Sequence, residues 1–291
     1  MAWPRLAAVR AVNPGRALYV VAVGVGWLGL VDDLPPAAEV ARTAGGVVAL
    51  GGGGPALTAT TVLVLALAVQ TVRRPSPWAP LLLFGLLAAY AGLEEGSAPR
   101  GLAGAGHGRV LAGASLLALG AGRLRAHRAP DDDRAALELA CGVVAALYVL
   151  AAVAKLRAGG LAWPWRANLP MLVYERSLVV DEPLASVRAW IAHHPSWCVA
   201  GGVAVLAAEL SAAAFVLPRA RFAVAGILTA MHLSLGICVG YAYLDWVAGV
   251  WGLALWTRGL RGGRTGADGR LEGGRGTTSA TLGAGLLAGG L

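Results

Sequence analysis

Four ionisable residues in apolar surroundings are the candidates for chemistry in this sequence. They are Lys155, Glu209, His232 and His107, and each lies within or beside a run of apolar residues. Ionisable groups at membrane depth are costly and mark functional sites by default. Lysine, glutamate and histidine can also accept or donate protons near neutral pH once burial changes their proton affinity. The four residues therefore predict acid–base chemistry.

Lys155 is the strongest of these candidates because it is the only lysine among 24 basic residues. A lysine near a helix end can extend its ammonium to the membrane interface, and this simpler role stays open. Arginine would serve that role equally well, yet it does not readily give up its proton, whereas a desolvated lysine can. A site that needs a removable proton would retain lysine, so Lys155 is predicted to be a general base.

The other candidates have structural alternatives. His232 can be a core histidine bonded to a carbonyl, and His107 borders a loop. Glu209 can be neutral and hydrogen-bonded, or it can pair with an arginine such as Arg219 or Arg221. No HxxxH, HExxH or carboxylate cluster is present, and the three cysteines have no CxxC spacing, so no metal is expected.

The composition predicts what positions these residues. Hydrophobic residues make up 57% of the 291 residues, charged residues 14%, and the mean hydropathy is +0.65. Soluble domains have about 25% charged residues, so the chain is expected to be an integral membrane protein in contact with the lipid bilayer. The net charge of +8 lies in short loops between apolar runs, where membrane topology explains it better than nucleic-acid binding.

Apolar runs of roughly 20 residues predict membrane-spanning helices. The fold class expected is an all-α polytopic bundle of about eight spans over residues 1–257, followed by a Gly/Arg-rich cytoplasmic tail over 258–291 that is expected to be disordered over 258–278. The predicted spans are 16–31, 55–72, 78–93, 108–124, 135–156, 198–217, 221–239 and 241–257.

Arginine placement predicts the orientation. Most basic residues face the cytoplasm if both termini do, which the positive-inside rule and an even span count favour. The expected location is the cell membrane, and Lys155 then lies near the outer leaflet. The first span can alternatively be a signal peptide with Arg16 as its basic region.

A long external connection over residues 157–197 follows Lys155 directly. Its segment from Trp163 to Pro170 combines aromatic rings with the fixed cation of Arg166. Tryptophan is common at membrane interfaces, so an anchoring role is one interpretation. The other is a lid over a lipid-accessible pocket, in which Trp163, Arg166 and Glu209 contact substrate.

These segments together resemble a known family. Tyr148–Leu156 followed by Trp163 resembles the "AGxxKL…W" signature of the vitamin K-dependent γ-carboxylases and their bacterial relatives, the horizontally transferred transmembrane (HTTM) domain proteins. Ala208–Arg219 is similar to that family's acidic helix, Met231–Ser234 to its histidine-containing helix, and His107 to its early histidine. The resemblance covers roughly residues 100–257.

The resemblance implies quinol chemistry. In the carboxylases, the corresponding lysine removes a proton from vitamin K hydroquinone, and the quinol anion then reacts with oxygen. Carried onto this chain, Lys155 would be the base, while His107 and His232 would hydrogen-bond the quinol or transfer protons. The implied cofactor or substrate is a lipid-soluble quinone of vitamin K or menaquinone type.

Three departures from the carboxylases favour the HTTM group over a protein carboxylase. Ala154 stands where the carboxylases have a second lysine, Gly106 replaces an asparagine, and Gly/Arg-rich sequence follows the helices instead of a lumenal domain. We therefore expect quinol-linked chemistry. The rival interpretation is a non-enzymatic accessory protein for export or maturation of a secreted peptide, or a small transporter.

Overall fold

The computed structural model describes residues 13–32, 54–97, 107–126, 133–166, 169–178, 184–240 and 243–275. Within these ranges the chain is helical and contains no strand, which confirms the all-α class for this part of the molecule. The long helices are α1 (Pro14–Asp32), α3 (Gly54–Arg73), α4 (Trp78–Ser97), α5 (His107–Arg125), α6 (Arg134–Gly159), α10 (Pro195–Ser211), α11 (Arg221–Val239) and α12 (Leu244–Arg275).

Five short helices complete the described chain. They are η2 (Gly160–Ala162), α7 (Trp163–Arg166), α8 (Leu169–Ser177), α9 (Ala185–Ala192) and η3 (Ala212–Val216). The first four lie in the predicted external connection over 157–197, and η3 continues α10. The predicted loop is therefore largely helical in its described part.

Three helical segments of the described chain are long and apolar enough to cross a membrane. They are Arg134–Trp165, Pro195–Val216 and Arg221–Val239, and at most 44% of each apolar window is buried inside the protein. The remaining residues face outward and include large apolar side chains such as Leu150, which is 62% exposed. Such surfaces suit contact with lipid. Shorter apolar helices cover Pro14–Leu28, Thr58–Arg73 and Trp78–Tyr90, so the count of eight spans stays a prediction.

The ends of these helices follow from local sequence. α10 begins with Pro195 in its first turn, where a missing N–H removes no helical hydrogen bond. α11 ends at Val239, and the next residue, Gly240, has φ of 81° and caps the helix in the left-handed conformation that glycine adopts without strain. α6 is long because its Ala- and Leu-rich sequence favours helix until Gly160.

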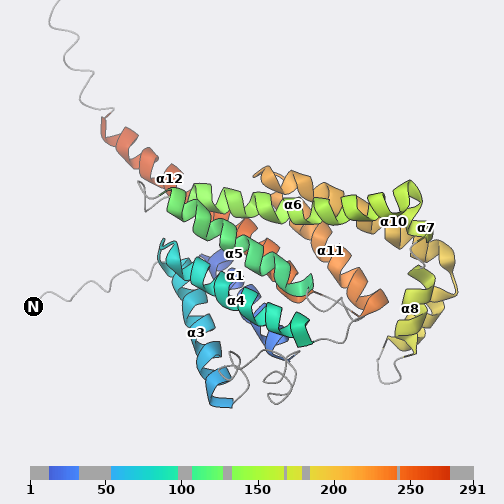
Figure 1. Ribbon diagram of the computed structural model, residues 1–291. Coiled ribbons are helices and arrows are strands. Elements are labelled where there is room, and N and C mark those ends of the chain that lie inside the picture. The colour runs from blue at the N-terminus through green and yellow to red at the C-terminus, as the bar shows by residue number, and fades with distance from the viewer. Residues whose placement is uncertain are drawn as a thin grey trace, which may run out of the picture.

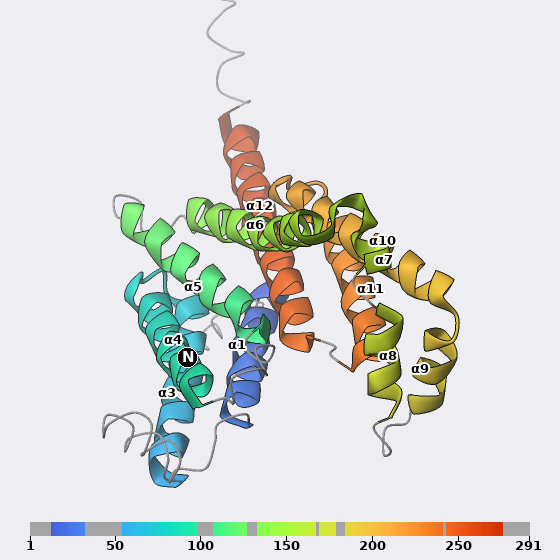
Figure 2. The same ribbon diagram turned by 45° about the vertical axis from the view of Figure 1, so that its right-hand side comes forward.

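Figures 1 and 2 show two groups of helices joined by α6 and α12. α1, α3, α4 and α5 form one group, and α10 and α11 with the short helices α7 to α9 form the other. α6 packs against both α5 and α10, while α12 packs along α1 and also contacts α11. α6 and α12 thus connect the amino-terminal half of the chain to the half that carries Lys155, Glu209 and His232.

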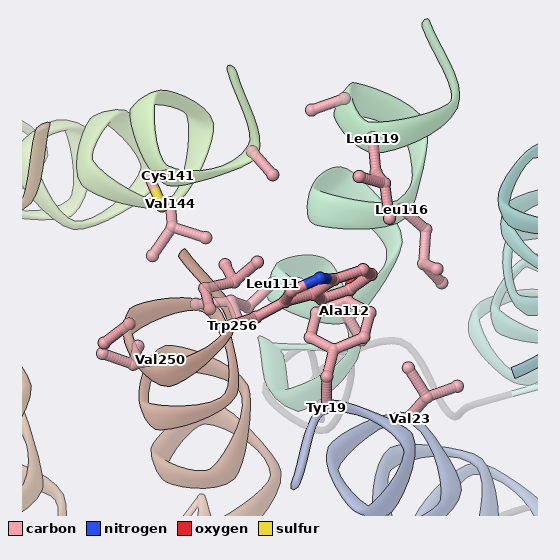
Figure 3. Packing of buried hydrophobic residues seen from close by; sticks show 14 of the residues in the cluster. Tyr19, Val23, Leu111, Ala112, Leu116, Leu119, Cys141, Val144, Val250 and Trp256 are labelled. Carbon is pink, nitrogen blue, oxygen red and sulfur yellow. The ribbon is translucent and has the colours of Figure 1, made fainter. Parts of the chain in front are cut away.

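An aromatic contact joins α1 of the first group to α12. Figure 3 shows Trp256 over Tyr19, with Leu111 of α5 and Val144 of α6 beside them. The ring centroids of Tyr19 and Trp256 are 5.8 Å apart and both side chains are buried. Four helices from distant parts of the sequence therefore meet at one apolar cluster.

The prediction that the last helix ends at 257 and is followed by disorder is wrong for residues 258–275. α12 continues to Arg275, and Leu260 still packs against the core. The helix also passes so close to Asn13, the residue before α1, that a Cβ at Gly259 would lie 2.1 Å from Asn13 Nδ2. Once α12 has formed past its apolar segment, each further residue adds a backbone hydrogen bond to an existing helix. Residues 276–291 lie outside the described chain.

Candidate functional site

Lys155 and Glu209 form an ion pair where α6 meets α10. The Lys155 Nζ donates to Glu209 Oε1 at 2.5 Å, although the residues are 54 positions apart in sequence. The lysine side chain is 27% exposed and the glutamate side chain only 8%. The carboxylate is therefore buried, while the ammonium keeps an opening to its surroundings.

This pairing identifies the side-chain partner of both residues. The ammonium of Lys155 binds a buried carboxylate rather than extending freely to an interface. Glu209 does not pair with Arg221, because Arg221 instead donates to Glu138 Oε2 and to the carbonyl of Phe215. The sequence alternative of a Glu209–Arg221 pair is thus wrong. Arg221 is the first residue of α11, and its side chain reaches the first turns of α6, where Glu138 lies.

Trp163 is placed beside Lys155 by a turn at the end of α6. Gly160 has φ of 60° and ψ of −154°, a backbone conformation that is essentially restricted to glycine. The turn brings the Trp163 side chain against Gly159, where an added Cβ would lie 3.0 Å from the tryptophan Cβ. Lys155 Nζ lies 5.7 Å from the Trp163 ring centroid, which is a cation–π distance. Trp163 therefore lies beside Lys155 in the folded chain.

His232 lies in a separate cluster of aromatic rings joined to α6. The Tyr148 hydroxyl and His232 Nε2 are 2.8 Å apart, and both residues are buried. Tyr243 and Trp246 also contact the imidazole, with ring centroids 5.6 and 5.8 Å away. Tyr243 has φ of 41°, a left-handed conformation that is rare for residues other than glycine. His232 therefore hydrogen-bonds a side chain, not a carbonyl as in the simpler expectation.

Two buried polar atoms in these clusters have no hydrogen-bond partner among the described residues. They are Glu209 Oε2 and His232 Nδ1. A buried polar atom without a partner costs about 1–3 kcal/mol, so native structures contain few. Both lie on candidate residues, one in each cluster. Each atom can still form a hydrogen bond.

The arrangement unites some predicted residues and leaves others unplaced. Lys155, Glu209 and Trp163 come together, and His232 lies in the adjoining cluster. His107 begins α5 and Arg166 ends α7, but the side chains of both lie outside the described residues. Their predicted roles therefore stay predictions.

Tyr148 is the residue that sequence reasoning missed. It lies seven positions before Lys155, so two helical turns place both on one face of α6. Ala152 lies between them on that face and is fully buried. The signal was available in the spacing, because a tyrosine at this position shares a helix face with the sole lysine.

The described residues contain no group of three or more His, Cys, Asp or Glu side chains suited to a metal ion. Cys141, Cys198 and Cys238 are free thiols. Proton transfer and hydrogen bonding are what the Lys155, Glu209, Tyr148 and His232 side chains can supply together.

Comparison with known proteins adds no identification: no family model, no curated protein and no solved structure matches this chain.

Proposed function

We propose that this chain is a multi-pass membrane protein of about eight spans that removes a proton from a lipid-soluble hydroxylated substrate. Lys155 is the base in this proposal, and the substrate is of quinol type. The observation that carries it is the ion pair between the only lysine and a buried glutamate, with the ammonium partly open.

Glu209 gives Lys155 a way to become a base. Separated charges are costly in a low-dielectric site, so moving one proton from the ammonium to the carboxylate replaces two charges with two neutral groups. The neutral amine then has a lone pair for the substrate hydroxyl proton. After this second transfer Lys155 is again an ammonium, Glu209 is a neutral acid, and the substrate oxygen is an anion beside the cation.

The surroundings of the pair suit a planar aromatic substrate. Trp163 offers a ring face next to the ammonium, and aromatic rings pack against one another at such faces. The resemblance to the γ-carboxylase membrane region suggests that the substrate is a quinol. His107 and Arg166 are proposed to assist in binding, and both termini are proposed to lie in the cytoplasm.

The test uses the full chain in lipid nanodiscs. Lipids extracted from the purified protein are searched for a bound quinone, and the oxidation of added menaquinol by oxygen is then followed. A quinol anion is oxidised faster than the neutral quinol, so wild-type protein should accelerate the reaction. Lys155→Arg should reduce this acceleration on the order of 100-fold, the lower end of general-base contributions.

The control is Arg157→Lys, which changes an exposed basic residue half a turn from Lys155 and should leave the rate unaltered. If the Lys155→Arg variant accelerated menaquinol oxidation as much as the wild-type protein does, a general-base role for Lys155 would be excluded, because arginine keeps its proton. Absence of both bound quinone and acceleration in the wild-type protein would refute the quinol assignment.

A further inference from the structure

α9 has its charge and its apolar residues on the opposite sides from those of a helix that faces water. Its only charged residue, Arg188, is 3% exposed, whereas Val187 and Trp190 are 41% and 54% exposed. Helices at the surface of soluble proteins bury their apolar face and turn their charged side chains to the solvent. The outward face of α9 therefore suits a less polar medium than water.

The buried arginine explains how α9 is held in this orientation. Arg188 Nε donates to the carbonyl of Ile237 at 2.7 Å, and its Nη2 donates to the carbonyl of Gly236 at 3.3 Å. Both carbonyls lie in the last turn of α11, where backbone oxygens lack partners within the helix and a cation is favoured. Arg188 thus fixes α9 against the end of α11, and Trp190, two positions along, lies on the opposite side of α9.

Trp190 forms an exposed patch with the residues that lead into α10. Its ring centroid is 4.4 Å from that of His194 and 6.3 Å from that of Trp197, which is 61% exposed. Val187 lies about one helical turn before Trp190 on the same exposed side. The patch of Val187, Trp190, His194 and Trp197 combines apolar ring faces with the polar ring nitrogens of two indoles and an imidazole.

The patch lies where three apolar helical segments end. Arg134–Trp165 ends, Pro195–Val216 begins and Arg221–Val239 ends on the side of the molecule where the short helices lie (Figures 1 and 2). α9 packs against both α10 and α11, and α7 packs against α6 and α10. If these segments cross a membrane, α9 lies at the level where they leave its apolar layer.

The exposed side of α10 begins at this patch. Ala200, Ala204 and Ala207 follow Trp197 at spacings of three and four residues, and all of them are exposed on one side of the helix. That side belongs to a segment apolar enough to span a membrane, so lipid is the medium expected beside it. Trp197 therefore joins the patch to a surface suited to lipid. This continuity favours lipid over a second protein as the occupant of the patch.

We infer that the patch of Val187, Trp190, His194 and Trp197 lies in the headgroup region of the lipid bilayer, at the level where these helices enter the membrane. Tryptophan is enriched at that level because its ring is apolar while its indole N–H can bond to headgroup and glycerol oxygens. Arg188 stays inside the protein, and α9 contacts the bilayer through its apolar side. The inference rests on the membrane placement in the proposed function and is independent of the quinol chemistry.

The test uses the wild-type chain in lipid vesicles, so the folding of a variant does not enter. Three photoactivatable diazirine probes are compared, which are a phospholipid that carries the diazirine near the headgroup, a phospholipid that carries it near the chain end, and a water-soluble compound. Mass spectrometry then locates the adducts. Trp190 and Trp197 should carry most adducts from the headgroup-side probe. Ala207 lies about 15 Å further along α10 than Trp197 and should carry most adducts from the chain-end probe.

The matched control is Trp27, which has the same indole ring but is fully buried. It should carry no adduct from any of the three probes, so labelling of Trp190 and Trp197 reports their surroundings and not the reactivity of indole.

Three labelling results would overturn the inference. Preferential labelling of Trp190 and Trp197 by the water-soluble probe would place the patch in water, and preferential labelling by the chain-end probe would place it in the apolar layer. Absence of adducts from all three probes would mean that protein, such as a second copy of this chain, covers the patch.

Membrane insertion is measured separately, by resistance of the protein to extraction with alkaline carbonate. Release by carbonate would contradict both the membrane placement in the proposed function and this inference. Retention in the membrane with a water-facing patch would contradict this inference alone. The quinol assay stays independent of either result, because no quinol is present.

Discussion

Near the amino-terminal end of α6, arginine side chains pair with the carboxylates of Asp133 and Glu138. Near its carboxyl-terminal end, Lys155 pairs with the carboxylate of Glu209. Arg123 binds both oxygens of Asp133 at 2.8 Å and also donates to the Ser76 carbonyl at 3.2 Å. Arg221 similarly binds Glu138 together with backbone carbonyls. Lys155 instead makes one short bond to Glu209, and the second oxygen of that carboxylate has no partner among the described residues.

The difference lies in whether a proton can move. A guanidinium keeps its charge, and its flat fork holds a carboxylate at two points, so the Arg123–Asp133 pair fixes the connection between α5 and α6. An ammonium can transfer a proton to its partner, which leaves both groups neutral. One end of α6 therefore has ion pairs suited to stability, and the other has one suited to chemistry.

The largest effect is expected from Asp133→Ala at the arginine end. Arg123 and Asp133 have side chains 3% and 7% exposed, and removal of one partner leaves a buried cation that cannot lose its charge. The free energy of unfolding should fall by about 3–5 kcal/mol. Reversible unfolding in mixed detergent micelles measures it. Arg125→Ala changes an exposed arginine in α5, the helix that carries Arg123. Its free energy of unfolding should stay within about 0.5 kcal/mol of wild type.

Lys155→Met at the other end should have a smaller effect on stability. The remaining Glu209 can take up a proton and become neutral, and the methionine fills most of the lysine volume. We expect a loss of about 1–3 kcal/mol in the same unfolding measurement. The matched control is Arg157→Met on the exposed side of the helix. A loss as large as that of Asp133→Ala would mean that Lys155–Glu209 is a structural pair, and the contrast between the two ends would fail.

The smallest effect on stability is expected for the cation–π contacts, which are those of Lys155 with Trp163 and of Arg258 with Phe222. A double-mutant cycle with Lys155→Met and Trp163→Leu should give a coupling of about 0.5–1 kcal/mol, which is typical of partly exposed cation–π pairs. Arg258 lies 5.2 Å from the Phe222 ring and provides a matching cycle on α11 and α12. A coupling near zero for Trp163 with a measurable one for Phe222 would show that Trp163 does not contact the ammonium.

The helical class and the candidate residues could be predicted from the sequence. Apolar runs identify the helices because each one must present apolar side chains over its length, and Lys155, Glu209 and His232 stand out because ionisable residues are rare in such runs. The end of α12 could not be predicted in this way. Its glycines and arginines favour a disordered tail locally, whereas the structure shows a helix that continues to Arg275 and packs at Gly259 and Leu260 against the rest of the chain.

The partners of the candidate residues are what the tertiary structure alone decided. Sequence periodicity identifies the face of a helix on which a residue lies, so the shared face of Tyr148 and Lys155 follows from their spacing. It does not say which helix covers that face. Apolar lipid gives little preference for one pair of apolar faces over another, and the choice depends on detailed packing along the whole contact. The joining of Lys155 to Glu209, 54 residues away, and of Tyr148 to His232, 84 residues away, therefore emerges only from the folded arrangement.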